Sequence, residues 1–140
     1  ETGRISIAAM AVGVAQACLD ESLKYARGRR QFDEPIFNFQ AVQFKLVDMA
    51  VAIELARNQY LKAAWLKDQG RQHTFETSAA KLYASEMVEK VASDAVQIHG
   101  GYGYMEEYAV SRYLRDSFVV GHSAGTSDIM KVIMCRWVLS

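Results

Sequence analysis

Proline occurs once in this chain of 140 residues, at Pro35, and this scarcity limits the possible folds more than any other feature. Proline interrupts helices because it lacks a backbone N–H and its ring clashes with the preceding turn. The stretches on either side are rich in Ala, Leu, Met, Lys, Glu and Gln, which favour helices, and show little strand-like alternation. The sequence therefore predicts an all-α protein.

Apolar residues at steps of three and four predict two long helices, over about residues 40–69 and 74–98. The apolar stripe of the first consists of Val42, Leu46, Met49, Ile53, Ala56, Tyr60 and Ala63. That of the second consists of Ala80, Ala84, Met87, Val91, Ala95 and Ile98. We expect Gly70 and the pair Gly100 and Gly101 to end these helices, and Thr74 to cap the second at its N-terminus.

Three more helices are expected, over about residues 4–27, 108–119 and 127–139. The first is rich in alanine and glycine, whose small side chains let a neighbouring helix approach closely. The predicted fold is an up-down four-helix bundle with additional short helices at the C-terminus. The connections 28–39 and 100–107 combine arginine or glycine with aromatic residues, which is unusual for plain spacers.

Charge and hydropathy exclude some functions. Sixteen basic and sixteen acidic residues cancel, which removes the electrostatic case for nonspecific nucleic-acid binding. No unbroken apolar run of about 18 residues is present, so we expect no transmembrane helix. Cys18 and Cys135 are far apart within helical patterns, which is typical of buried, reduced thiols in an intracellular protein.

Common catalytic and metal-binding patterns are missing. Long segments separate His73, His99 and His122, and no paired-ligand spacing exists, so we expect no metal site. Ser123 follows His122 directly, and neighbours in sequence seldom place a base against a hydroxyl, so a nucleophilic triad is not expected.

Two features favour phosphate binding. Arg29 and Arg30 offer guanidinium groups that match phosphate oxygens, although on composition alone a solvated surface explains them better. The turn G-G-Y-G at residues 100–103 could bring bare backbone N–H groups up to a phosphate.

Together these features form the pattern of a known family. The run Q-I-H-G-G-Y-G-Y-M-E-E-Y-A-V-S-R-Y-L-R-D, residues 97–116, resembles the C-terminal signature of the acyl-CoA dehydrogenases. The run Y-A-R-G-R-R-Q-F-D-E-P-I-F-N-F-Q-A-V-Q-F-K-L-V-D-M-A, residues 25–50, matches a second stretch of that family. A third, R-I-S-I-A-A-M-A-V-G-V-A-Q at residues 4–16, matches its opening helix. The resemblance covers essentially the whole chain.

This resemblance implies that residues 1–140 are the C-terminal helical domain of a longer enzyme, and the chain begins at Glu1, as expected for a fragment. A helical and a β domain would precede it. Family members oxidise an acyl-CoA thioester with FAD and are usually tetramers, built as dimers of dimers with the FAD at a subunit interface. The family also suggests electron-transfer flavoprotein as electron acceptor, and a location in the bacterial cytoplasm or the mitochondrial matrix.

The resemblance also assigns roles by position. Arg29, Gln31 and Phe32 would contact the pyrophosphate and adenosine of FAD, and Gln40 its adenine end. Gln97 and the backbone of Gly101 would approach the pyrophosphate of the partner subunit's FAD. Thr126 and Asp128 would contact the FAD of the same chain. Arg4 and Gly125 would lie on the substrate side.

The position of the usual catalytic base is the main departure from the family. In most members a glutamate precedes the Gly-Thr pair and removes the α-proton of the thioester, and here Ala124 stands there. Some relatives carry this glutamate on the first helix, where this chain has Gly3. Glu1 is nearby, but two residues along a helix is about 200° around its axis, so it should point elsewhere. No catalytic residue is therefore assigned.

Four explanations for Ala124 stay open. A partner in a mixed oligomer supplies the glutamate, or the chain belongs to a branch with other flavin chemistry, such as a monooxygenase or reductase. Alternatively, the upstream portion supplies the base, or the alanine is engineered. A hypothesis of another class is a non-catalytic helical module that retains only the subunit interface.

Overall fold

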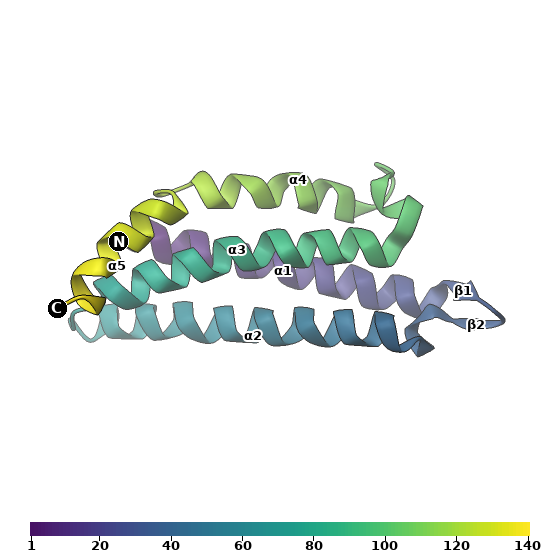
Figure 1. The fold of residues 1–140 in the computed structure, drawn as a ribbon, viewed down its shortest axis with the longest axis horizontal. Helices are drawn as coiled ribbons and strands as arrows, with labels where there is room; N and C mark the ends of the chain where they lie inside the picture. The colour runs from purple at the N-terminus through teal and green to yellow at the C-terminus, as the bar shows by residue number, and fades with distance from the viewer.

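The computed structural model describes residues 1–140 and contains five α-helices, a small hairpin and two short 3-10 helices (Figure 1). The elements are α1 (Thr2–Gly28), β1 (Arg30–Gln31), β2 (Glu34–Pro35), η1 (Ile36–Asn38), α2 (Gln40–Asp68), α3 (Thr74–His99), η2 (Gly100–Tyr104), α4 (Ala109–His122) and α5 (Ser127–Val138). The all-α prediction is confirmed, and the helix bounds differ from those expected by a few residues at most.

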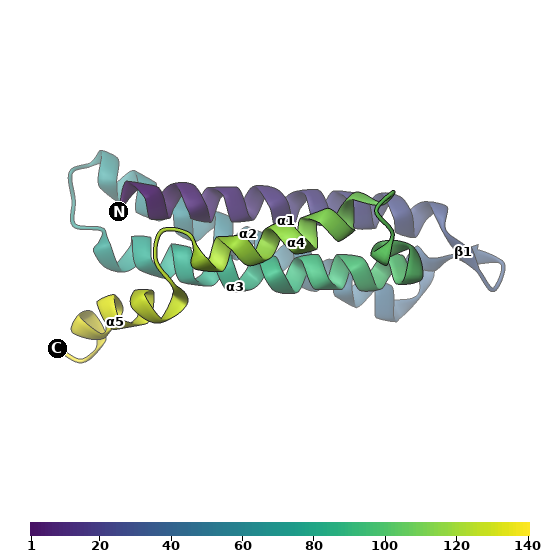
Figure 2. The same cartoon turned by 90° about the horizontal axis from the view of Figure 1, so that it is seen from above.

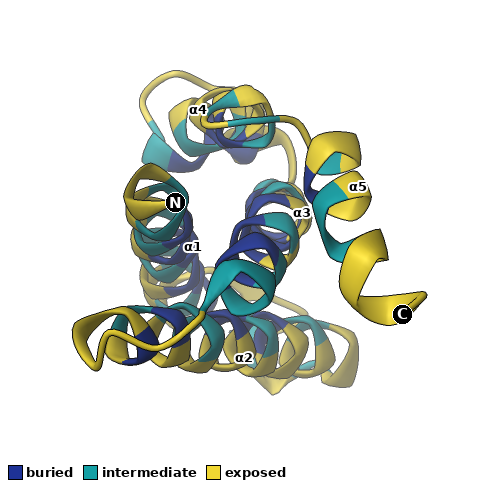
Figure 3. Cartoon of the chain, turned by 90° about the vertical axis from the view of Figure 1, so that its left-hand side faces the viewer, coloured by how far each residue is buried: buried dark blue, intermediate teal, exposed yellow.

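Helices α1 to α4 run alternately up and down and form the predicted four-helix bundle (Figure 1). Viewed along the bundle, their buried faces point inward, while α5 lies outside against α3 (Figure 3). The view from above shows α4 crossing over α1 and α3 before the chain turns into α5 (Figure 2). The hairpin and η2 lie at one end of the bundle, and the N-terminus, α5 and the α4–α5 loop lie towards the other (Figure 1).

The core lies where the predicted stripes meet. All six stripe residues of α3 are buried, as are five of the seven in α2, and Val42 and Tyr60 pack partly against the core. Helix α1 contributes its small residues, of which Ala8, Ala11 and Ala15 are fully covered. Its closeness to α3 follows from these short side chains, because they allow the two backbones to approach.

Two local expectations were wrong. Thr74 is not the N-cap of α3: His73 holds that position, and the Thr74 hydroxyl instead donates to Oε1 of Glu1 at 2.5 Å. Cys135 is exposed, because α5 packs on the outside of the bundle and buries only Met130. Cys18 is buried as expected, and burial raises the pKa of its thiol to about 12.

One helix bears on the expectation that no segment spans a membrane. Helix α1 reaches a mean hydropathy of 1.4 over 18 residues, so by length and composition alone it could cross a bilayer. The sequence contains no unbroken apolar run there, but its isoleucines, valines and alanines keep the average high despite Arg4, Ser6 and Gln16. Core helices of soluble proteins meet the same test, and in this fold α1 packs against α2, α3 and α4.

Candidate functional site

The predicted site residues fall into two groups at opposite ends of the bundle. The hairpin end carries Arg29, Gln31, Phe32, Gln40, Gln97 and Gly101 (Figure 1). The loop end carries Gly3, Arg4, Ala124, Gly125, Thr126 and Asp128 (Figure 1). Helix α3 runs between the two ends, and its 26 residues make it about 39 Å long.

The connection between α1 and α2 was expected as a loop, and the structure instead forms a short hairpin there. Gln31 pairs with Glu34, so only Phe32 and Asp33 form the turn, with φ angles of 52° and 66°. Two positive φ values define a type I′ turn, whose twist suits a two-residue hairpin. Asp33 tolerates this conformation, and Arg30 donates a hydrogen bond to its carbonyl oxygen. A bulky residue such as Phe32 rarely adopts it, and here its ring is 88% exposed.

A cavity of about 500 Å³ lies beside this hairpin, between the end of α1 and η2. Its lining includes three of the predicted cofactor contacts, Arg29, Gln31 and Gly101, although 70 residues separate Gln31 from Gly101. The Arg29 guanidinium lies 5.5 Å from the ring centre of Tyr102. Phe32, Gln40 and Gln97 are exposed at the same end but do not line the cavity.

Four aromatic rings form one wall of this end. His99 stacks on Tyr25 with ring centres 4.3 Å apart, and the edge of Tyr108 packs against both. Tyr102 extends the cluster, 5.4 Å from Tyr108. Sequence reasoning did not select Tyr25 or His99 as site residues. Their signal was only indirect: Tyr25 precedes Arg29 by one helical turn, and His99 immediately precedes the glycine pair.

His99 is almost fully buried within this cluster. Its Nδ1 lies 2.8 Å from the carbonyl oxygen of Ala95, so in the neutral ring this nitrogen carries the proton and donates it. Burial lowers the pKa of His99, and it outweighs the opposing effects of the Ala95 hydrogen bond and of Glu21. The His99 ring is therefore uncharged at neutral pH. It forms part of the aromatic wall, and its second ring nitrogen makes no hydrogen bond.

The glycines of η2 differ in what surrounds them. A Cβ on Gly103 would lie 2.5 Å from the backbone oxygen of Val96 and 3.0 Å from Cβ of His99, so only glycine fits. A Cβ on Gly101 would meet nothing within 4 Å. Gly103 therefore allows η2 to fold back on α3, whereas Gly101 leaves its backbone open towards the cavity.

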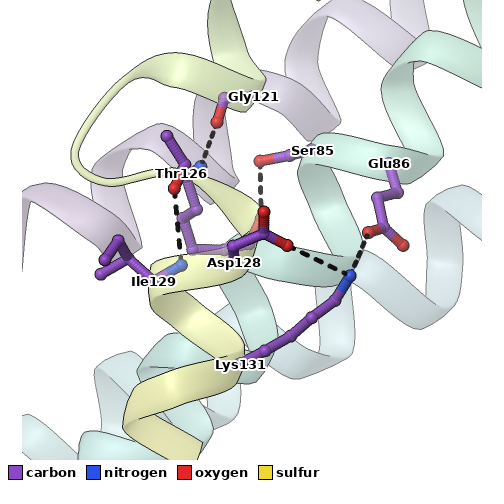
Figure 4. A network of polar contacts seen from close by, with 8 residues as sticks. Ser85, Glu86, Gly121, Thr126, Asp128, Ile129 and Lys131 are labelled. Atoms are coloured by element: carbon purple, nitrogen blue, oxygen red, sulfur yellow. Dashed lines mark hydrogen bonds and ion pairs between the residues drawn. The ribbon is translucent and has the colours of Figure 1, made fainter.

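At the loop end, α4 is followed by a tight turn into α5. Ala124 and Gly125 both have positive φ, 56° and 105°, and a Cβ on Gly125 would lie 2.9 Å from Cε of Met130. Thr126 is the N-cap of α5, and its hydroxyl accepts a long hydrogen bond of 3.4 Å from the N–H of Ile129 (Figure 4). Asp128 is exposed, and Lys131 reaches towards both its carboxylate and that of Glu86 (Figure 4).

Neither predicted base position carries a carboxylate, and the nearby Glu1 is engaged elsewhere. Its Oε1 accepts the hydrogen bond from Thr74, and its Oε2 lies 3.7 Å from Nε2 of His73. The hydrogen bond from Thr74 lowers the pKa of the Glu1 carboxyl. Glu1 thus joins the start of α1 to the start of α3, which agrees with the expectation that it points away from the position of Gly3.

The hairpin end suits a ligand that carries phosphate. It combines a guanidinium, a side-chain amide and a glycine backbone around one cavity, and such donors bind phosphate oxygens. Nothing comparable gathers at the loop end, and no group of three or more His, Cys, Asp or Glu residues is placed to hold a metal ion.

Comparison with known proteins shows the family of this chain. The family model described as "Acyl-CoA dehydrogenase, C-terminal domain" matches residues 1–139. The Bacillus subtilis protein named "Probable acyl-CoA dehydrogenase YngJ" is 57% identical over 98% of this chain and 36% of its own length. Subunit CarC of the caffeyl-CoA reductase-Etf complex of Acetobacterium woodii is 43% identical over 99% of this chain and 37% of its own length.

Among solved structures, butyryl-CoA dehydrogenase from Megasphaera elsdenii superposes with a TM-score of 0.96 at 41% identity, covering 98% of this chain and 36% of that one. The chain therefore spans little more than a third of the length of the relatives it matches. From the match over residues 1–139 and from these identities, we conclude that the chain belongs to the acyl-CoA dehydrogenase family.

Proposed function

We propose that this chain is the C-terminal domain of an FAD-dependent oxidoreductase that acts on an acyl-CoA thioester. The observation that carries the proposal is the cavity at the hairpin end, where Arg29, Gln31 and the Gly101 backbone converge beside Tyr102. Its donors match the pyrophosphate of FAD, and its aromatic wall matches the adenosine. Family membership supports FAD as the dinucleotide.

When bound, FAD supplies the acceptor for the hydride that leaves the β-carbon of the acyl group. The residues of this chain have two tasks: holding the dinucleotide and placing the loop end against the substrate. Ala124 stands where the α-proton would be accepted, and a methyl group cannot accept one. A positioned base contributes about 10²- to 10⁴-fold in rate, or roughly 3–5 kcal/mol. We propose that unaided α,β-dehydrogenation by this chain is slow.

We also propose that two copies, or this chain and a related partner, build each site. The two groups of site residues lie at opposite ends of a helix about 39 Å long, so one copy does not bring both to one cofactor. Helix α2 supports assembly, since its outer face leaves Phe44, Val47, Val51 and Leu55 more than half exposed. An apolar stripe of this kind is typical of a surface covered by another subunit. A tetramer like those of the family would bring the two groups of site residues together and would also cover the apolar face of α2.

A second function is the reverse reaction, reduction of an unsaturated acyl-CoA with electrons from an electron-transfer flavoprotein. It is supported by the 43% identity to a subunit of the caffeyl-CoA reductase-Etf complex. Reduction delivers a proton to the α-carbon instead of removing one, and Ala124 supplies no such proton either. In both directions a partner or the upstream portion of the protein would have to provide the group.

The complete protein tests this proposal in two steps. We expect it to be yellow as isolated, or to take up added FAD and become yellow. A colourless protein that rejects FAD would favour the non-catalytic assembly module. Anaerobic mixing with saturated acyl-CoAs of several chain lengths then tests the first direction, and we expect slow bleaching of the flavin. Reoxidation of the reduced protein by enoyl-CoAs tests the second direction.

A further inference from the structure

Lys81 is the largest side chain in the protein that is fully buried, with an exposed fraction of 0%. It lies on α3, and its Nζ donates a hydrogen bond of 2.9 Å to the carbonyl oxygen of Gly121 in the last turn of α4. No carboxylate lies within ion-pair distance of it. Burial lowers the pKa of Lys81, and the positive charge of Arg4 lowers it further.

A buried cation without a carboxylate is costly for the fold, so its single contact needs a reason. Helix α4 ends at His122, and the carbonyl of Gly121 therefore belongs to the last turn, whose carbonyls have no partner within the helix. A positive charge at this end also interacts favourably with the helix dipole. Lys81 thus fixes the C-terminal turn of α4 to α3.

This contact stands at the entrance of the loop that contains Ala124. Gly121 itself lies close to α3, since a Cβ added there would be 3.3 Å from Oε1 of Glu89. Three residues after Gly121 the chain adopts positive φ at Ala124, and the Thr126 cap then starts α5. The loop is therefore held at both ends, by Lys81 before residue 124 and by the cap after it.

We propose that Lys81 is a positioning residue, which sets the direction of residue 124 by holding the Gly121 carbonyl against α3. The proposal rests on the proposed function, because it takes residue 124 as the position of the proton acceptor. Lys81 does not itself touch the substrate in this account. It acts through the backbone of the loop.

The first test measures the loop and not the reaction. In the complete protein with FAD, Lys81→Met keeps the side-chain volume and removes the donor, and Lys67→Met is the control at an exposed lysine of α2. We expect hydrogen exchange at the amides of residues 121–126 to become about tenfold faster in Lys81→Met, with the hairpin amides unchanged. Unchanged exchange in the loop would overturn the proposal. Lys81→Leu, which also lacks a donor, replaces the methionine variant if that variant does not fold.

The second test uses a glutamate introduced at residue 124. We expect Ala124→Glu to speed flavin bleaching by an acyl-CoA at least about 100-fold in the presence of Lys81. In the Lys81→Met background, the increase in the limiting bleaching rate caused by Ala124→Glu should be about tenfold smaller. The acyl-CoA concentration that gives half of the limiting rate should change little. An equal gain in both backgrounds would contradict the positioning role.

The two tests separate the two proposals. If Ala124→Glu gains nothing even with Lys81 present, residue 124 is not the position of the proton acceptor, and the proposed function fails at that point. The exchange of the loop amides then still decides whether Lys81 holds the loop.

Discussion

The two ends of the bundle are built in different ways. At the hairpin end, side chains from α1, β1 and η2 converge on one cavity, with stacked rings and a cation over an aromatic face. At the loop end, the backbone is shaped by positive φ angles, an N-cap and one buried lysine, while Ala124 and Asp128 are exposed. The hairpin end thus gathers donors that bind phosphate oxygens, whereas the loop end offers a shaped backbone and no carboxylate at residue 124.

Under the proposed function, this difference implies that cofactor binding and proton transfer rest on separate parts of the fold. The cavity depends on several residues from three elements, so single substitutions weaken it without abolishing it. In the proposed function, proton transfer instead depends on a single side chain, the one at residue 124.

The largest expected effect is that of Ala124→Glu in the complete protein. It should raise the rate of flavin bleaching by a suitable acyl-CoA about 10²- to 10⁴-fold, because a carboxylate then stands where the α-proton leaves. Stopped-flow absorbance under anaerobic conditions measures this rate. Ala124→Gln, of similar size but not basic, is the control and should give no gain. Fast bleaching by the unmodified protein would show that its base lies elsewhere.

The next effect concerns the fold of the hairpin end. Gly103→Ala forces a methyl group against the Val96 oxygen, so the free energy of unfolding should fall by about 3 kcal/mol. Gly101→Ala, whose Cβ meets nothing, is the matched control and should leave stability unchanged while weakening FAD binding. Denaturant unfolding of both variants measures the contrast. Equal stability of the two variants would mean that η2 does not pack against α3 as described.

A smaller effect is expected for the two neighbouring arginines. Arg29→Ala should weaken FAD binding by about 10- to 100-fold, because it removes a charged hydrogen-bond donor worth about 1.5–3 kcal/mol. Arg30→Ala is the control, since the Arg30 side chain instead contacts the turn at Asp33. Titration of the apoprotein with FAD compares them. Equal losses would show that the hairpin attracts phosphate only through its overall charge.

The smallest effect is a dependence of stability on pH at His99. Burial lowers its pKa in the folded state below the ordinary value of 6.5, so the unfolded chain takes up the proton first. The contribution of neutral His99 to the free energy of unfolding is therefore complete above about pH 6.5 and is lost as the pH falls towards the folded pKa. The loss is about 1.4 kcal/mol for each unit of difference between the unfolded and the folded pKa. His99→Phe should reduce the loss of stability between pH 7 and pH 5, as measured by thermal unfolding at both pH values. The control His122→Gln, at an exposed position, should leave that loss unchanged.

The bundle was predictable because its apolar periodicity is continuous. The stripe of α3 is interrupted by no proline and its residues all reach the core, so helix, face and direction followed from spacing alone. The hairpin was not predictable, because its turn places Phe32 at positive φ, which residue preference argues against. Cys135 was misjudged because periodicity shows which face is apolar but not whether another element covers it.

The candidate site was predictable in its residues but not in its arrangement. Family motifs selected Arg29, Gln31 and Gly101, and the fold brings them to one cavity across 70 residues of sequence. Lys81 gave no such signal, since a lysine amid alanines on a helix is expected at the surface. Its burial depends on where α4 ends, which is a property of the packed fold.

The account depends on each cofactor being held by the hairpin end of one copy and the loop end of another. Coexpression of two differently tagged variants of the complete protein tests this directly. One carries Arg29→Ala and Gln97→Ala, the other Thr126→Val and Asp128→Ala, and each alone should lose most of its FAD. In a mixed pair, one site combines the unchanged hairpin end of one copy with the unchanged loop end of the other. We therefore predict that oligomers purified through both tags regain FAD at that one of the two sites. Mixed oligomers that bind no more FAD than their parents would contradict the account.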